Sequence, residues 1–266
     1  MLPLSQLLLL SLIQGLTEFI PVSSSAHLAI LPNLLNWQDQ GLMIDVALHF
    51  GTLLSVVLYF RADMWKMIVG GFDTLTFKPS AERDLFLYLC VATIPLILMG
   101  LAVTLLFGDA RALEVMAWAS IGFGALLYVV DKKSATNKVM TQMSYGSALV
   151  IGLIQSLAVI PGTSRAGSSM TALRLLGYSR VDTAHFSCLL SIPAVMAASA
   201  LMAYKMVKVG HVDLYGNVLI AALLSFVAGY ISIDFMMRWV RRSTYTVFVI
   251  YRMALGCLLL FWVYWR

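Results

Sequence analysis

The chain has 266 residues, of which 61% are hydrophobic and 12% are charged, and its mean hydropathy is +0.88. This composition excludes an ordinary soluble globular domain and predicts an all-α polytopic membrane protein. The net charge of +5 comes from short basic clusters rather than from one basic stripe. We therefore expect these residues to set membrane topology and not to bind nucleic acid.

The membrane-spanning helices are predicted from the lengths of the apolar stretches. A helix needs about 20 residues to cross a bilayer. Residues 61–83 mix charged and aromatic residues, which is typical of an interfacial helix and loop. Six other stretches are long enough to be full spans: 41–60, 84–107, 111–131, 181–207, 213–238 and 244–265.

Two further apolar regions are each interrupted by proline and are predicted to form pairs of short helices that enter the membrane without crossing it. Proline removes a backbone donor and ends a helix. The first pair is broken at Pro21 and the second at Pro161 and Gly162. The four short helices are expected at 3–18 and 25–35, and at 144–158 and 165–177.

The two broken pairs resemble each other in sequence. Leu-Ile-Gln-Gly-Leu at 12–16 recurs as Leu-Ile-Gln-Ser-Leu at 153–157, and Ile-Pro and a Ser/Thr-rich run follow in both cases. We interpret residues 1–266 as a single membrane domain that is internally duplicated. The first repeat covers about residues 1–131 and the second about 143–266.

The loop charges predict the orientation of the chain. If the spans alternate, twelve of the 18 Lys and Arg residues fall on one side and four on the other. The positive-inside rule makes the richer side cytoplasmic, so both termini face outward. The first broken pair then enters from outside and the second from the cytoplasm. Two similar units of opposite orientation form an inverted-topology repeat, whose sites lie near the midplane where broken helices meet.

The first break carries a cluster of polar residues at membrane depth, where ionisable groups are costly and usually functional. Gln14 and Glu18 are four residues apart and share a helix face. Ser23, Ser24 and Ser25 can cap a new helix, which turns His27 back toward Glu18. For Ser23 and Ser25 a capping role alone is the simpler interpretation, but Ser23 and Gln14 are also counted as candidate substrate-binding residues.

The second break is typical of an anion site. Gly162 lets the backbone turn tightly, and Thr163 and Ser164 supply hydroxyls beside free N–H groups at a helix start. Arg165 adds a planar guanidinium that binds phosphate oxygens in bidentate fashion. The competing interpretation is that Arg165 merely neutralises Glu18 as a structural ion pair.

Together the two breaks hold the groups that phosphoryl transfer requires. Arg165 can stabilise charge on phosphate oxygens, and Glu18 can bind a divalent metal or orient water. The nucleophile stays open between His27, Ser24 activated by His27, and a metal-bound water. Asp45 and His49 share a face of the next helix and are predicted to line the site.

These motifs resemble bacterial undecaprenyl pyrophosphate phosphatase of the bacitracin-resistance type. The resemblance rests on Gln-x-x-x-Glu at 14–18, Phe-Ile-Pro-Val-Ser-Ser-Ser-Ala-His at 19–27 and Pro-Gly-Thr-Ser-Arg-Ala-Gly at 161–167, and it extends to residues 45–52 and 186–193. The family often has Glu where this chain has Gln14, which cannot act as a base. It also tends to have Glu where this chain has His185.

The resemblance implies an integral inner-membrane enzyme that hydrolyses undecaprenyl pyrophosphate to undecaprenyl phosphate and inorganic phosphate. This reaction recycles the lipid carrier of peptidoglycan precursors and confers bacitracin resistance. The resemblance also implies a periplasmic site and a divalent cation, magnesium or calcium. It makes Glu18 the essential carboxylate, His27 the catalytic imidazole, Ser24 a hydroxyl of the site and Arg165 the pyrophosphate-binding residue.

A second function is also compatible with the sequence. Inverted repeats with broken helices are a device of transporters, so the chain could instead move a polyprenyl phosphate lipid across the membrane. Such a flippase needs Arg165 and the helix N-termini but has little use for both Glu18 and His27. The expected partners are the polyprenyl pyrophosphate substrate and membrane lipids. The sequence does not determine the oligomeric state, and a homo-oligomer is compatible with it.

Overall fold

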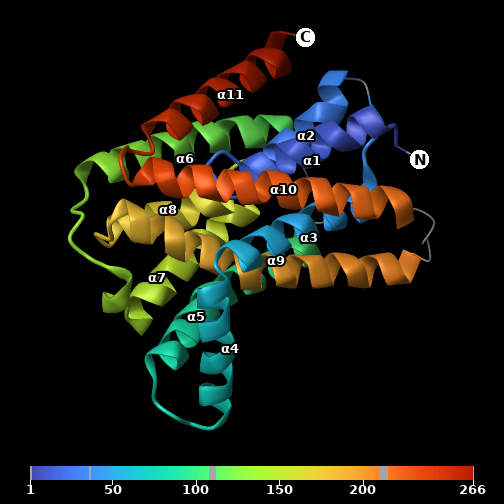
Figure 1. The fold of residues 1–266 in the computed structure, drawn as a ribbon. Coiled ribbons are helices and arrows are strands. Elements are labelled where there is room, and N and C mark those ends of the chain that lie inside the picture. The colour runs from blue at the N-terminus through green and yellow to red at the C-terminus, as the bar shows by residue number, and fades with distance from the viewer. Residues whose placement is uncertain (1, 36, 108–111, 210–214, 266) are drawn as a thin grey trace.

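The computed structural model describes residues 2–35, 37–107, 112–209 and 215–265, and this part of the chain is helical with no strand beyond one isolated bridge between Lys138 and Tyr178 (Figure 1). The helices in chain order are α1 Leu4–Glu18, α2 Ser24–Leu35, α3 Gly41–Tyr59, α4 Arg61–Leu75, α5 Ala81–Phe107, α6 Leu113–Lys133, η1 Met140–Gln142, α7 Tyr145–Ser156, η2 Leu157–Val159, α8 Arg165–Leu175, α9 Arg180–Val209, α10 Tyr215–Val240 and α11 Thr246–Trp265.

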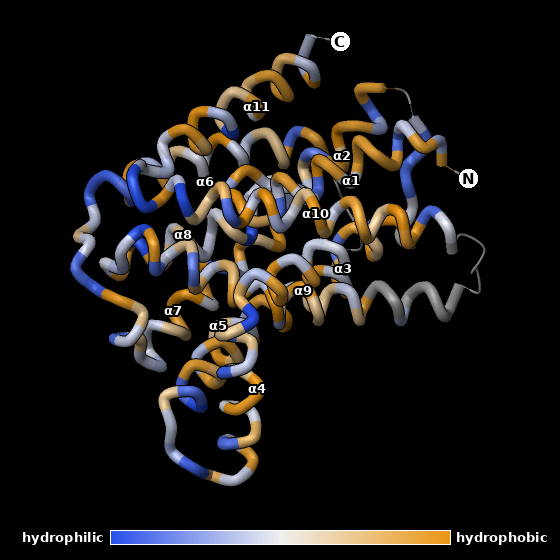
Figure 2. The backbone as a smooth tube through the Cα atoms, in the orientation of Figure 1, coloured by the Kyte–Doolittle hydropathy of each residue, from blue (hydrophilic) through white to orange (hydrophobic). Residues whose placement is uncertain are grey.

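The prediction of a polytopic membrane protein is confirmed. Within the described ranges five helices are long and apolar enough to cross a bilayer: α5, α6, α9, α10 and α11. The sixth predicted span, α3, meets the criterion together with α4, to which it is joined by a bend of 91°. In Figure 2 hydrophilic residues gather in the α6–α7 connection and the α4–α5 turn, and apolar residues follow the helices.

The helix α9 lies at the centre of the bundle. Its apolar window is 56% buried, against 17–33% for the other four long helices, because α3, α5 and α8 all pack against it. The buried residues Phe186, Leu189 and Ile192 make α9 a main contributor to the largest hydrophobic core. The two short helices that carry the polar motifs pack against longer apolar helices: α8 against α6 and α9, and α1 against α3 and α10.

The two breaks fold in the same way. In each, one serine with positive φ immediately precedes the second short helix: Ser23, with φ of 71°, before α2, and Ser164, with φ of 72°, before α8. Gln14 and Gln155 stand at the same distance before these serines, as the sequence repeat requires. A left-handed serine reverses the chain direction at a cost of order 1–3 kcal/mol, so both breaks store similar strain.

The helix contacts are those expected of two interlocked units. The helix α1 packs on α10 of the second half, and α7 packs on α5 of the first half. The pairs α3 with α9 and α6 with α11 bring equivalent helices together. These contacts support the duplication, whereas the opposite orientation of the two units stays a prediction. The loop charges behind that prediction include Arg111 and Arg266, which lie outside the described residues.

A buried ion-pair network joins the end of α8 to α6 and to the connection that follows α6. Arg174 has no exposed surface, and its Nε donates to Asp131 on α6 at 2.9 Å. Its Nη atoms donate to backbone carbonyls of Ser134, Ala135 and Tyr178. Because a buried charge must be paired, this arginine fixes the α6–α7 connection to α8.

The second break also depends on one glycine. Gly162 has φ of +91°, and a Cβ there would lie 2.3 Å from the carbonyl oxygen of Met116 on α6. The backbone of α6 can approach the break only because no side chain intervenes. Gly177, with φ of +87°, has no such neighbour within 4 Å.

We expect Gly162→Ala to lower the free energy of unfolding by more than Gly177→Ala does. Both changes incur backbone strain of about 1–3 kcal/mol, but only the first adds a collision with α6. Thermal unfolding of the two purified variants in the same detergent measures the difference. Equal melting temperatures would show that the approach of α6 to the break is not constrained.

Candidate active site

The two breaks meet inside the bundle. Arg165, the first residue of α8, donates from Nη2 to Oε1 of Glu18, the last residue of α1, at 3.2 Å, although the two are 147 positions apart in the chain. The Nη1 atom of Arg165 donates to the carbonyl of Ser187 on α9 at 3.2 Å. The predicted convergence of the two breaks around one guanidinium and one carboxylate is therefore present.

The second carboxylate oxygen of Glu18 is engaged by residues of the first break. Ser24 donates its hydroxyl to Oε2 at 2.6 Å, and Gln14 donates from Nε2 to the same oxygen at 3.0 Å. The helical spacing of Gln14 and Glu18 brings the amide donor to the carboxylate, as predicted. The turn at Pro21 brings Ser24 to Glu18, where the sequence predicted His27 instead. A hydroxyl that donates to a carboxylate has a proton acceptor already in place.

A cavity of about 340 Å³ opens in front of this cluster. The Arg165 and Glu18 side chains keep 13% and 8% of their surface exposed, so both are accessible from the cavity. Its polar lining comes from both breaks and from α3, and its apolar lining from α5, η2 and α9: Glu18, Ser23, Ser24, Ser25, His49, Ser164 and Arg165, with Leu96, Ala158, Val159, Ala194, Val195 and Ala198.

His27 lies beside the first break but not on this cavity. Its Nδ1 is 2.8 Å from the carbonyl of Ser23, which can only accept, so Nδ1 carries the proton. In the neutral ring Nε2 then accepts from the hydroxyl of Tyr251 on α11 at 2.7 Å, and the two rings are stacked. In this arrangement Ser24 is paired with Glu18 rather than with His27, which is not the geometry for deprotonation by His27.

His49 is the imidazole that lines the cavity. Its Nδ1 donates to the carbonyl of Asp45 at 2.7 Å. In the neutral ring Nε2 then carries no proton and can accept a hydrogen bond. The Asp45 carboxylate does not line the cavity; it accepts a hydrogen bond from Gln40 at 2.9 Å. Of this predicted pair, only His49 reaches the site directly.

The predicted residues of the second break divide into two groups. Ser164 and Arg165 line the cavity, and Ser164 also caps α8 by accepting from the N–H of Gly167 at 3.1 Å. Gly162 and Thr163 do not line it: Gly162 packs against α6, and Thr163 is fully buried. Of the first-break residues, Gln14 too is buried behind Glu18, whereas Ser23 reaches the cavity.

Arg252 on α11 is an isolated polar residue in a predicted span, for which the sequence favours packing or lipid-headgroup contact no less than a function. It has no exposed surface and donates to the carbonyls of Pro21, Gly162 and Thr163. A lone charge in the middle of a predicted span was the available signal, since such charges are usually functional. No motif surrounds Arg252, so the sequence assigns it no role at the site.

A divalent cation would find one protein carboxylate in the cavity, that of Glu18. Among the described residues there is no group of three or more His, Cys, Asp or Glu side chains that could hold an ion alone. Magnesium commonly binds through one or two carboxylates together with substrate phosphates and water. The residues therefore fit an ion that arrives with a diphosphate, with Glu18 as its protein ligand.

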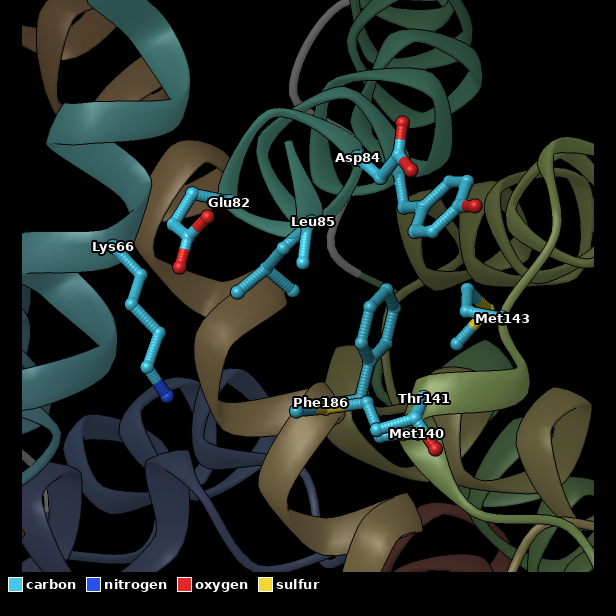
Figure 3. A pocket seen from close by; sticks show the side chains of 10 residues that line it. Lys66, Glu82, Asp84, Leu85, Met140, Thr141, Met143 and Phe186 are labelled. Carbon is cyan, nitrogen blue, oxygen red and sulfur yellow. The ribbon is translucent and has the colours of Figure 1, made fainter. Parts of the chain in front are cut away.

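A second cavity, of about 330 Å³, lies between α4, α5, η1 and α9 (Figure 3). It presents the carboxylates of Glu82 and Asp84 with the single cation Lys66 and has no arginine. That charge balance does not suit a diphosphate. Nearby, His185 contacts Asp63 at 2.9 Å and stacks on Phe60, so it joins α9 to α4 and to the residue between α3 and α4.

Comparisons with known proteins give one consistent result. The model of the family "Bacitracin resistance protein BacA" matches residues 7–258. Undecaprenyl-diphosphatase of Erythrobacter litoralis is 40% identical over 96% of this chain and 98% of its own length. The enzymes of the same name from Saccharophagus degradans and Ruegeria sp. are 43% and 42% identical, over 93% and 98% of this chain and 93% and 99% of their own lengths. The chain therefore belongs to the bacitracin resistance protein BacA family.

Proposed function

We propose that this membrane protein is an undecaprenyl-diphosphatase, which hydrolyses undecaprenyl pyrophosphate to undecaprenyl phosphate and inorganic phosphate. The observation that carries this proposal is the contact of Arg165 with Glu18 and of Glu18 with Ser24 at one cavity. The names of the relatives point to the same reaction, and they favour hydrolysis over the flippase alternative. The product is the lipid carrier of peptidoglycan synthesis, whose recycling accounts for bacitracin resistance.

In the resting state Arg165 is paired with Glu18, and the substrate changes this balance. A diphosphate carries more negative charge than a carboxylate and accepts bidentate hydrogen bonds from a guanidinium. We infer that substrate draws Arg165 onto its phosphate oxygens and leaves Glu18 as a free base beside Ser24. Arg165 and Glu18 then form an ion pair without substrate, and in the substrate complex they act separately, Arg165 on the phosphate oxygens and Glu18 as the base.

The geometry supports Ser24 as the attacking group. Its hydroxyl already donates to Glu18 at 2.6 Å, so the proton passes to Glu18 as the Ser24 oxygen bonds to the terminal phosphorus. The bond from that phosphorus to the bridging oxygen breaks, and undecaprenyl phosphate leaves. Water then attacks the same phosphorus, the bond from phosphorus to the Ser24 oxygen breaks, and the proton on Glu18 returns to that oxygen as inorganic phosphate leaves. Arg165 neutralises charge on the phosphate oxygens in both steps.

Glu18 would also be the protein ligand of a magnesium or calcium ion. Such an ion, when bound, withdraws charge from the phosphate oxygens and orients them. With one carboxylate at the site, most of its ligands come from the substrate and water.

The cavity has an apolar continuation that suits a prenyl chain. An apolar space of about 250 Å³ lies next to the polar cavity, between α5 and α9, and is distinct from the cavity near Lys66. It shares four lining residues with the polar cavity: Leu96, Val159, Ala194 and Ala198. The rest of its wall is formed by Thr104 and by apolar residues that include Gly100 and Ala197. A lipid diphosphate can therefore place its headgroup at Arg165 and the first part of its chain between these helices.

We further propose that the protein lies in the bacterial inner membrane with its site open to the periplasm. The support is the charge asymmetry of the loops, with twelve Lys and Arg residues on the side opposite the termini and four on the other. Undecaprenyl pyrophosphate released outside the cytoplasm would then reach the site without crossing the membrane.

We expect Glu18→Gln and Arg165→Ala each to lower kcat/KM for undecaprenyl pyrophosphate by at least about 100-fold, because each removes a group that acts in the transition state. Phosphate release by purified protein in detergent with magnesium measures this. Glu82→Gln, which removes a carboxylate from the other cavity, is the matched control and should leave the rate unchanged. A Glu18→Gln enzyme of normal activity would refute the assignment of this cavity.

We expect Gly100→Leu to discriminate between substrates by chain length. A Cβ at Gly100 meets only Val159 at 4.0 Å, so the helix tolerates a side chain that fills the apolar space. The KM for the C55 diphosphate should rise by at least about 10-fold, since burial of an isoprene unit is worth several CH₂ groups, and that for dimethylallyl diphosphate should not change.

Gly122→Leu on α6, which also has open space around it, is the control for this experiment. An equal rise of KM for both substrates in Gly100→Leu, or no rise for either, would place the prenyl chain elsewhere.

A further inference from the structure

Arg252 is a buried cation whose hydrogen bonds all go to the backbone of the two breaks. Its Nη1 donates to the carbonyl of Pro21 at 3.3 Å, and its Nη2 donates to the carbonyls of Gly162 at 2.9 Å and Thr163 at 2.8 Å. Pro21 belongs to the first break, and the other two residues belong to the second. One guanidinium thus connects two segments that are far apart in the sequence.

The burial of Arg252 requires an explanation. No ion pair joins it to a carboxylate within the ranges that the structure describes, and its side chain has no exposed surface. An unpaired charge in such surroundings is expensive unless hydrogen bonds satisfy it. The three carbonyl groups supply that compensation at the two Nη atoms, whereas Nε has no hydrogen-bond partner among the described residues. The position of the arginine and the positions of both breaks therefore depend on one another.

The packing around Arg252 leaves it little freedom. A Cβ at Gly167 of α8 would lie 2.8 Å from Nη1, and a Cβ at Gly124 of α6 would lie 3.1 Å from its Cγ. The arginine therefore lies in a slot formed by two glycines. Its planar fork presents donors in fixed directions, which a flexible lysine ammonium cannot reproduce.

We propose that Arg252 is a positioning residue that holds the two breaks in register, so that Glu18 and Ser24 of the first face Arg165 of the second. It does not line the cavity in which we propose that the diphosphate binds. It acts through backbone that precedes Ser24 and Arg165 by two or three residues. Its effect on rate rests on the proposed phosphatase activity, whereas its effect on geometry does not.

The first test is kinetic and uses Arg252→Lys, which keeps the charge but loses the fork. We expect kcat to fall at least about 100-fold in the folded protein, because small misplacements of reacting groups are that costly. Arg174→Lys is the matched control: that arginine is equally buried on α8 but binds carbonyls away from the breaks. It should lose thermal stability and retain kcat.

A double-mutant cycle separates positioning from general destabilisation. If Arg252 acts by aligning Arg165 with Glu18, then Arg252→Lys should cost little more once Arg165→Ala has removed the aligned group. Additive losses across the cycle would overturn the proposal, as would a normal kcat in Arg252→Lys.

The second test measures geometry and needs no activity. Spin labels on cysteines placed at the exposed residues Ser25 and Ile160, with Cys90, Cys188 and Cys257 replaced, report the distance between the breaks. We expect a narrow distribution in the parent and a broadened or shifted one with Arg252→Lys or Arg252→Met. An unchanged distribution would overturn the proposal. Activity is measured on the unlabelled natural protein, because Ser25 lines the cavity. If that protein is inactive and the distribution still depends on Arg252, the phosphatase function alone is refuted.

Discussion

The structure depends on keeping an arginine and a carboxylate together inside an apolar bundle. Neither charge could be buried there alone, because the desolvation of a single ion costs several kcal/mol. The Arg165–Glu18 contact at 3.2 Å meets this requirement only if two breaks from different halves of the chain approach each other. The other features of the site serve that approach: the left-handed serines, the glycine against α6 and the bonds from α11.

The exposure of the same pair supports a functional rather than a structural interpretation of Arg165. A purely structural ion pair would be sealed from solvent, as the contact between Arg174 and Asp131 is, with 0% and 2% of the side chains exposed. Arg165 and Glu18 instead border a cavity with several hydroxyl groups. A ligand can reach them there, and a diphosphate has the charge to displace the carboxylate from the guanidinium.

Much of this could be predicted from the sequence, because a bilayer restricts the choice of structures. Apolar length located the spans to within a few residues, and the proline in each repeated motif located the breaks. The chemistry of Glu18 and Arg165 placed both in one site, since few arrangements satisfy such residues in a membrane. The sequence paired Ser24 with His27, whereas the structure pairs it with Glu18. The chain does not show in advance which way a side chain points, and this is why His27 contacts Tyr251, Asp45 contacts Gln40, and Thr163 lies behind the cavity.

Arg252 illustrates the other limit of sequence reasoning. Its importance comes from three carbonyl groups, and backbone carbonyls leave no trace in a sequence. The right-angled bend between α3 and α4 could not be predicted either. Tyr59 and Arg61 indicate the membrane interface, but they do not indicate the direction of the chain after it. Long-range packing decides both features.

The most direct test of the central claim is a structure determined with the methylene-bridged analogue of a prenyl diphosphate, which cannot be hydrolysed at the bridge. The account predicts the diphosphonate in the cavity between the breaks, with Arg165 on its oxygens and Ser24 beside the terminal phosphorus. A diphosphonate bound elsewhere, with the contact between Arg165 and Glu18 unchanged, would contradict it.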